Sequence, residues 1–315
     1  MQYFLGVDVG GTKTEFAIGD ESRELARVAT GTIKRMKVDA ATAEANLQEG
    51  LRQLESATGV AARAIARCCI GTAGETVPMV VKWLREAFAR HVGGELVIVG
   101  DVEIALDSVF RGGRGVLVLA GTGSNVAGRA STGKIVRAGG WGPALADQGS
   151  GHFIALEALR RGFLAIDQRR PTRLLDLACS FWKLETLGDL VEFANANPAP
   201  EYSRFAPLVV SAAEQGDAVA REVLEQGGHD LAYLASLAIE HIRSLEPPTD
   251  SFELPPVAIA SSVLQNAAAV RDALIARLRQ MYPGIVVRHT PADALAGALW
   301  KARQPIRSPH APPSL

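Results

Sequence analysis

The chain has 315 residues, of which 48 % are hydrophobic and 21 % are charged, a composition typical of globular proteins large enough for two domains. A formal net charge of −1 excludes an overall field that attracts nucleic acid or an anionic membrane, and no apolar run approaches the roughly 20 residues of a membrane span. Cys68, Cys69 and Cys179 lack metal-binding spacing, and the N-terminus lacks the basic segment of a signal peptide. We therefore expect a cytoplasmic protein whose partners include neither nucleic acid nor a membrane.

Strand and helix patterns alternate through the first third of the chain. Apolar runs rich in β-branched residues predict strands, and apolar residues at helical spacing predict helices. Together they indicate an α/β domain. The predicted strands are 3–9, 15–19, 23–30, 67–72 and 95–99, and the predicted helices are 40–58, 78–91 and 102–110.

A glycine turn joins the first two predicted strands. Glycines let the backbone approach a phosphate closely, and the hydroxyl and ammonium groups after them are donors. A strand rather than a helix follows, so the turn differs from the P-loop of nucleotide-binding proteins. The alternative is a plain hairpin with a solvated Lys13. Asp8 precedes the turn, which reads Gly10, Gly11, Thr12, Lys13 and Thr14.

Asp101 follows the strand 95–99 and precedes the helix 102–110. Open α/β sheets place ligand-binding residues at the carboxyl ends of their strands, which makes this carboxylate a candidate for catalysis. Asp is also among the preferred residues at a helix N-cap, and the two roles do not exclude each other.

A glycine cluster at 112–115 predicts a domain boundary, after which the order of elements repeats. We expect an N-terminal domain over 1–114, a C-terminal domain with a helical insertion over 115–290, a closing helix over 291–304 that packs on the N-terminal domain, and a disordered tail over 305–315. The stretch with Trp182, Phe193 and Tyr202 is predicted to be loose, as a lid or a dimer surface. The later predicted strands are 115–120, 125–130, 134–138, 255–260 and 285–288, and the helices are 150–161, 205–214, 218–242 and 266–281.

Three glycine-rich groups follow the strand 115–120. Backbone N–H groups in such turns can bind a phosphate or a sugar without obstruction by side chains, and Asp147 adds a carboxylate. Plain hairpin turns are the alternative. The groups read Gly121-Thr122-Gly123-Ser124-Asn125, Gly139-Gly140-Trp141-Gly142 and Asp147-Gln148-Gly149-Ser150-Gly151.

The Asp8 turn, the pair Gly100-Asp101 and the glycine-rich groups occur in an order that resembles N-acetylglucosamine kinase-like sugar kinases. These kinases share a family with the activator ATPases of benzoyl-CoA reductase and 2-hydroxyacyl-CoA dehydratase, within the actin, hexokinase and heat-shock-chaperone superfamily. The resemblance covers essentially the whole chain. It implies an α/β fold of two ribonuclease-H-like (actin-like ATPase) domains with an inter-domain cleft, and a homodimer.

The resemblance also implies the roles of individual residues. Asp8 would hold Mg²⁺, and Asp101 would be the general base on a sugar hydroxyl. The sugar would be bound by Ser124, Asn125, Gly140, Trp141 and Asp147. ATP would be bound by Gly10, Gly11, Thr12, Lys13, Thr14, Gly121, Thr122, Gly123, Ser261, Ser262 and Asn266.

Two stretches depart from the family pattern. Ser261-Ser262 stands where the superfamily usually has two glycines, which questions the nucleotide preference. The basic loop Lys34-Arg35-Met36-Lys37 stands where relatives that bind N-acetylglucosamine usually have an Asn. Charged runs are usually solvated, but this one is also compatible with an anionic amino sugar such as N-acetylmuramic acid.

The leading hypothesis is an ATP-dependent kinase that transfers a phosphoryl group to N-acetylglucosamine or glucosamine. N-acetylmuramic acid is the alternative sugar. An activator ATPase would need cysteines that hold an iron–sulfur cluster between two subunits, and the three cysteines have no suitable arrangement. A sugar- or nucleotide-sensing protein is the third alternative, although Asp8 and Asp101 are both present and no DNA-binding motif is attached.

Overall fold

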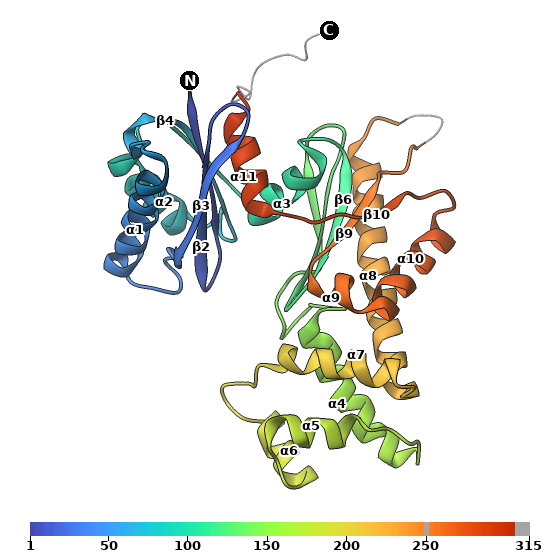
Figure 1. Cartoon of the computed structure of the whole chain (residues 1–315). Coiled ribbons are helices and arrows are strands. Elements are labelled where there is room, and N and C mark those ends of the chain that lie inside the picture. The colour runs from blue at the N-terminus through green and yellow to red at the C-terminus, as the bar shows by residue number, and fades with distance from the viewer. Residues whose placement is uncertain (249–251, 306–315) are drawn as a thin grey trace. The chain divides into compact units, whose positions relative to one another are not determined.

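The computed structural model describes residues 1–248 and 252–305. The tail over 305–315 that was predicted to be disordered lies outside the described residues, apart from Pro305. Contacts divide the chain into two compact units, of which the first comprises Met1–Gly113 with the segment from Ala292 onward and the second comprises Arg114–Pro291. Each unit has its own sheet and its own covering helices (Figure 1).

The first unit contains a five-stranded sheet with the strand order β3-β2-β1-β4-β5. Strands β1, β2 and β3 are antiparallel neighbours, whereas β4 and β5 run parallel to β1. The carboxyl ends of β1, β4 and β5 therefore meet at one edge, where open α/β sheets bind ligands. The strands are β1 (Tyr3–Val9), β2 (Lys13–Gly19), β3 (Glu24–Gly31), β4 (Ile65–Thr72) and β5 (Glu95–Val99).

Helices cover both faces of this sheet. Successive residues of a strand point to opposite faces, so buried Cys68 belongs to the core beneath α1 and α2, and buried Cys69 to the core beneath α3 and α11. The last helix of the chain, red in Figure 1, lies against the blue strands of this unit. The helices are α1 (Ala40–Thr58), α2 (Pro78–His91), α3 (Asp101–Phe110) and α11 (Ala294–Arg303), with a short 3₁₀ turn, η1 (Ala62–Ala64).

The second unit repeats this sheet. Its strand order is β8-β7-β6-β9-β10, with β6, β7 and β8 antiparallel and with β9 and β10 parallel to β6. The predicted α/β class and the repeated order of strands are confirmed, although the two sequences are not similar. The strands are β6 (Gly115–Ala120), β7 (Ser124–Arg129), β8 (Ile135–Ala138), β9 (Val257–Ala260) and β10 (Val287–His289).

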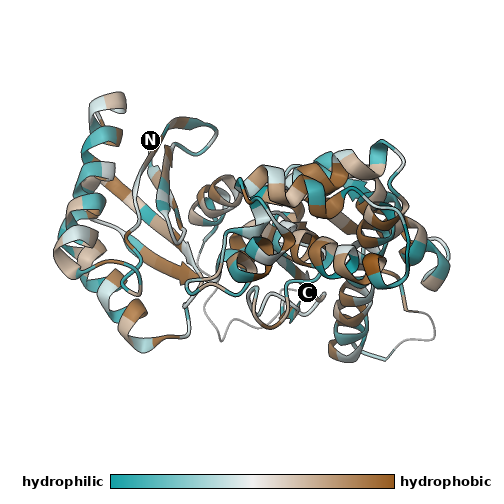
Figure 2. Cartoon of the chain, turned by 90° about the horizontal axis from the view of Figure 1, so that it is seen from below, coloured by the Kyte–Doolittle hydropathy of each residue, from teal (hydrophilic) through white to brown (hydrophobic). Residues whose placement is uncertain are grey.

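One hydrophobic core joins the helices of the second unit to its sheet. The long helix α8 packs on β6, β7 and β8 and also contacts α4, α7 and α10. Helices in Figure 2 carry both hydrophobic (brown) and hydrophilic (teal) residues, as expected when one face of a helix is buried. The helices are α4 (Gly151–Asp167), α5 (Leu174–Trp182), α6 (Leu187–Ala194), η2 (Tyr202–Phe205, 3₁₀), α7 (Ala206–Glu214), α8 (Ala218–Leu245), α9 (Ser262–Asn266) and α10 (Ala268–Met281).

The stretch predicted to be loose is packed around an aromatic cluster instead. The ring of Trp182 lies 4.9 Å from that of Phe193 and 5.0 Å from that of Phe205, between centroids. Tyr202 is 4 % exposed, and its hydroxyl donates to the carbonyl of Ala194. The prediction was wrong because these rings come from separate short elements, so no single segment shows their periodicity.

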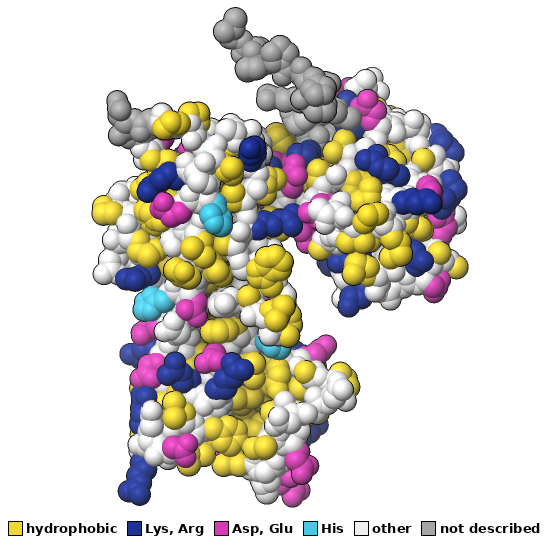
Figure 3. Space-filling model, turned by 180° about the vertical axis from the view of Figure 1, so that it is seen from behind, with side chains coloured by type: hydrophobic (Ala, Val, Ile, Leu, Met, Phe, Trp, Pro, Cys, Tyr) yellow, Lys and Arg dark blue, Asp and Glu magenta, His cyan; other side chains and the backbone are white. Residues whose placement is uncertain are grey.

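Several boundaries differ from the predicted ones; for example, the helix predicted over 150–161 extends to Asp167 as α4. The helix predicted over 266–281 begins at Ala268, because Asn266 ends the separate short helix α9 and the φ of −103° and ψ of 87° at Ala267 are not helical. The last strand, predicted over 285–288, begins two residues later and ends one residue later, at Val287–His289. Among the described residues no helix is both long and apolar enough to cross a membrane. Figure 3 shows acidic and basic side chains interspersed over the face drawn.

Candidate active site

In the first unit, Asp8 and Asp101 are close enough for their charges to interact. Asp8 is in β1 and Asp101 is the first residue of α3, directly after β5. Burial, and after it the negative charges of Asp101 and Glu15, raise the pKa of Asp8 to about 6, whereas Lys13 opposes this shift. Two carboxylates that repel each other at the ligand-binding edge of a sheet are a candidate catalytic pair.

The helix-cap alternative for Asp101 is only partly right. The N-cap residue is Gly100, and α3 begins at Asp101 itself rather than at Val102. One carboxylate oxygen of Asp101 accepts the N–H of Val102 at 2.8 Å. The second oxygen forms no hydrogen bond with the described residues, so the carboxylate can stabilise the helix start and still accept a proton.

The glycine turn between β1 and β2 is held by its neighbours. The hydroxyl of Thr32 donates to the carbonyl of Gly10 at 2.6 Å, and a Cβ at Gly10 would lie 2.9 Å from the carbonyl oxygen of Lys13. A Cβ at Gly11 would meet no atom within 4 Å, so the backbone there is open to a ligand. Thr12 is exposed beside it.

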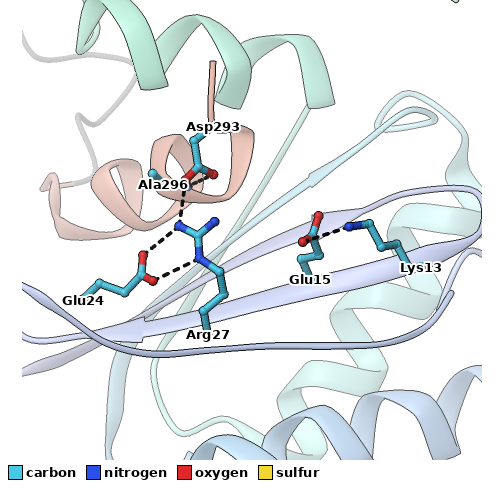
Figure 4. Close-up of polar contacts among 6 residues, drawn as sticks. All are labelled: Lys13, Glu15, Glu24, Arg27, Asp293 and Ala296. Atoms are coloured by element: carbon cyan, nitrogen blue, oxygen red, sulfur yellow. Dashed lines mark hydrogen bonds and ion pairs between the residues drawn. The ribbon is translucent and has the colours of Figure 1, made fainter. Parts of the chain in front are cut away.

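The side chains of Thr14 and Lys13, both predicted to bind phosphate, already have partners within the protein. Thr14 is fully buried, and its hydroxyl accepts the N–H of Ile33 at 3.0 Å. Its side chain therefore holds the loop after β3 and does not face the turn. Lys13 is exposed and forms an ion pair with Glu15 at 3.0 Å (Figure 4).

A second ion-pair group anchors α11 beside this turn. Arg27 of β3 donates to both oxygens of Glu24 at 3.0 Å and to Asp293 at 2.7 Å (Figure 4). Asp293 is the N-cap of α11 and accepts the N–H of Ala296 at 3.1 Å. Its charge also raises the pKa of Asp8, which places this helix start near the carboxylate pair.

In the second unit, the turn Gly121–Gly123 is attached to the start of α4. The N–H of Gly151 donates to the carbonyl of Gly121 at 2.8 Å, and the N–H of His152 donates to that of Thr122 at 3.2 Å. Ser150 caps the helix by accepting the N–H of Phe153. Ser124 is buried, and its hydroxyl donates to the carbonyl of Gln148, so its side chain supports the turn.

A cavity of about 400 Å³ opens beside this turn, a size suited to a nucleoside. We call it the α4–α7 pocket. Apolar residues of α4 and α7 form much of its wall, and among its lining residues there is no cation. Its polar side chains are Thr122, Ser203, Ser211, Glu214, Ser262 and Asn266.

Three of these polar residues were not identified from the sequence. Ser203, Ser211 and Glu214 belong to η2 and α7, whose apolar pattern indicates only a packed helix. No local signal distinguishes them from other polar residues of that helix. Ser261 itself is not among the lining residues, but it directly precedes the lining residue Ser262 with φ of 82° and ψ of 167°.

The predicted sugar ligands Asn125 and Asp147 flank the start of β7. A Cβ at Gly140 would lie 2.7 Å from Asn125 Nδ2, and Asn125 Oδ1 is buried without a partner among the described residues. Asp147 Oδ2 would lie 2.9 Å from a Cβ at Gly123. Burial raises the pKa of Asp147, while N–H groups of the turn and His152 lower it. Trp141 is 76 % exposed.

The residues present fit Mg²⁺ bound together with phosphates. No cluster of three or more His, Cys, Asp or Glu that could hold a metal occurs in the part of the chain that the structure describes. Mg²⁺ characteristically uses one or two carboxylates and completes its shell with water and substrate phosphates. The repelling pair of Asp8 and Asp101 supplies hard oxygen donors in a place where a cation would relieve the repulsion.

The chain is similar to known sugar kinases over nearly its whole length. The N-acetylmuramic acid/N-acetylglucosamine kinase of Clostridium acetobutylicum is 28 % identical over 309 residues, which cover 96 % of this chain and 99 % of that protein. The N-acetyl-D-glucosamine kinase of Dictyostelium discoideum is also 28 % identical, over 94 % of this chain and 96 % of that protein.

A solved structure and a family model agree with these relatives. The structure, from a Chromobacterium violaceum protein proposed to be an N-acetylglucosamine kinase, has a TM-score of 0.71 and 27 % identity, and covers 96 % of this chain and 99 % of that one. The model of the BadF/BadG/BcrA/BcrD ATPase family matches residues 5–302. With two α/β units of matching topology and a match over nearly its full length, the chain belongs to the BadF/BadG/BcrA/BcrD ATPase family.

Proposed function

We propose that this protein is an ATP-dependent kinase that phosphorylates a hydroxyl of an amino sugar, N-acetylglucosamine or glucosamine. The observation that carries the proposal is the pair Asp8 and Asp101 at the ligand-binding edge of the first sheet. Two relatives that match nearly the whole chain are named as kinases of such sugars. The second candidate sugar, N-acetylmuramic acid, rests on the name of one of these relatives.

Phosphoryl transfer requires mainly positioning, charge neutralisation and one carboxylate that takes the proton of the attacking hydroxyl. In this proposal Asp101 is that base, since its second oxygen is available. Asp8 would hold Mg²⁺, which neutralises charge on the transferred phosphoryl group when bound. Asp147 and the unpartnered Asn125 Oδ1 would accept hydroxyl hydrogen bonds and orient the sugar.

Of the remaining predicted residues, some would bind the nucleotide and others the sugar. The open backbone at Gly11 and Thr12 would bind phosphates, and the Gly121–Gly123 turn would be the second phosphate loop. The α4–α7 pocket would receive the nucleoside, with Ser262 and Asn266 on its wall. Trp141 would stack on an apolar face of the sugar, because its exposed ring is free to contact a ligand.

The activator-ATPase alternative is disfavoured by the cysteines. Cys68 and Cys69 are both fully buried in β4 and point to opposite faces of the sheet. A cluster shared between two subunits needs cysteines exposed on one surface. Only the partly exposed Cys179, in α5, remains, and it cannot hold such a cluster alone.

The test is a coupled ADP-release assay with Mg-ATP and N-acetylglucosamine, glucosamine, N-acetylmuramic acid, glucose or no sugar. Asp101→Asn should lower sugar-dependent turnover about 10²- to 10⁴-fold, the usual contribution of a general base, and leave sugar binding intact. The exposed carboxylate variant Asp272→Asn is the matched control and should have unchanged activity. ADP release that no sugar stimulates, or that survives Asp101→Asn, would overturn the proposal.

A further inference from the structure

A second cavity in the same unit is lined by Asp147, which does not line the α4–α7 pocket. It has a volume of about 270 Å³ and is formed by the loop 143–148 and one face of α4. Phe153, Leu156 and Arg160 have the spacing i, i+3, i+7 that places side chains on one helix face. We call this space the α4 groove.

The chemistry of the α4 groove changes along the helix. His152 and Asp147 lie at one end and Arg160 at the other, and eight helical residues correspond to about 12 Å. Phe153 and Leu156 form an apolar wall between them. Side chains on a helix lean toward its N-terminus, and the charge of Arg160 acts on His152, so the guanidinium comes within reach of a substituent on a ligand whose hydroxyl Asp147 holds.

Arg160 retains donors for such a substituent. Only one of its terminal nitrogens, Nη1, donates to Glu157, at 2.7 Å. That bond orients the guanidinium along the helix, while Nε and Nη2 form no hydrogen bond with the described residues. A guanidinium presents a planar fork that matches a carboxylate.

The wall of the α4 groove also contains an unsatisfied polar atom. Gln148 Oε1 is buried and has no partner among the described residues. Its neighbour Asp147 is itself 9 % exposed. A buried acceptor without a donor costs free energy, and rotation of the Gln148 side chain toward the groove would bring this oxygen to an amide N–H of a ligand. An acetamido group beside a ring hydroxyl on Asp147 supplies such a donor.

We propose that the α4 groove extends the sugar site and accepts a hexosamine that carries a carboxylate on an ether substituent, with Arg160 binding the carboxylate. The inference rests on the proposed function for the place of the sugar ring. It assigns acceptance of an anionic sugar to α4, whereas the sequence had suggested the basic loop 34–37, which belongs to the other unit. Arg160 is then a specificity-determining residue.

The experiment measures binding of N-acetylmuramic acid and N-acetylglucosamine by calorimetry without nucleotide, and kcat and KM for both sugars by ADP release. The variants are Arg160→Gln, Arg160→Lys and Arg161→Gln. Arg161 is the matched control, because it also faces Glu157, at 4.0 Å, but does not line the groove.

Arg160→Gln should raise Kd and KM for N-acetylmuramic acid about tenfold, the loss of one charge-assisted contact, with values for N-acetylglucosamine changed less than twofold. Arg160→Lys should restore part of the loss, and Arg161→Gln should change neither sugar. Equal effects on both sugars, no effect, or no binding of N-acetylmuramic acid by the unaltered protein would overturn the inference. Binding that depends on Arg160 without sugar-stimulated ADP release would overturn the proposed function and leave the groove assignment standing.

Discussion

At the scale of single residues, Ser261 has a strained backbone conformation next to the α4–α7 pocket. Its φ of 82° and ψ of 167° lie in a region that is essentially restricted to glycine, at a cost on the order of 1–3 kcal/mol. The next residue, Ser262, begins α9 and lines the α4–α7 pocket, and both serines lie against Gly121. The chain therefore retains strain beside its proposed nucleotide site.

We expect Ser261→Gly to increase the free energy of unfolding by about 1 kcal/mol, because relief of backbone strain exceeds the extra entropy of glycine in the unfolded chain. Urea denaturation measures the change. Ser262→Gly is the control, since this residue is helical without strain, and it should lower the free energy by about 0.5–1 kcal/mol. A loss of stability in Ser261→Gly would show that the serine is not strained there.

At the scale of elements, docking of α11 completes the first sheet. Leu299 of α11 approaches β1 so closely that a Cβ at Gly6 would lie 2.5 Å from its nitrogen. Lys301 forms ion pairs with Glu103 at 2.5 Å and with buried Asp107 at 3.2 Å, which join α11 to α3. Since α3 begins at Asp101 and Asp293 is the N-cap of α11, packing of these helices fixes where both carboxylates lie.

Gly297→Ala should separate these two helices. A Cβ at Gly297 would overlap the carbonyl oxygen of Ile104 in α3 and lie 2.7 Å from the nitrogen of Ser108. Overpacking of backbone against backbone costs at least about 1–3 kcal/mol, and we expect a loss of this size with reduced activity. Chemical denaturation measures it.

Gly188→Ala is the matched control for this change. Gly188 is also helical, in α6, but the nearest atom to its added Cβ would be Thr186 Oγ1 at 3.4 Å. Alanine has the higher helix propensity, so this variant should be neutral or stabilised by less than about 1 kcal/mol. Equal losses in both variants would contradict the close helix contact at Gly297.

At the scale of the whole molecule, the chain crosses between its units twice, near Gly113 and near Ala292. The second unit is continuous, whereas the first is completed by the last helix of the chain. Without α11, Phe4, Cys69 and Ile104 lose their apolar cover of Leu295 and Leu299. The two units should therefore differ in whether they remain folded when α11 is removed.

We expect a chain that ends at Pro291 to lose the folded first unit and keep the second. Hydrogen exchange followed by mass spectrometry should show complete exchange in β1 and β4 and retained protection in α8. Removal of residues 306–315 alone is the control and should leave protection unchanged. Protected β1 in the chain ending at Pro291 would show that the first unit folds without α11.

Local patterns predicted most of the elements and pointed to candidate residues for the site. Strand and helix periodicity gave α1 and α2 with their observed bounds, because one buried face imposes a period on each segment. Glycine turns directly after strands marked the positions of Asp8, Asp101 and the Gly121–Gly123 turn, since chain order alone places these residues at the carboxyl ends of strands. The repeated strand order was likewise visible in the chain.

Only the tertiary structure decided which side chains are available at these positions. Thr14 and Ser124 carry suitable hydroxyls, yet contacts with residues distant in sequence bury both. Glu214 and Arg160 face cavities because their helices pack against other elements. The aromatic cluster around Trp182 arises in the same way. Contacts between segments depend on how faces meet in space, and the period of one segment carries no information about its partner.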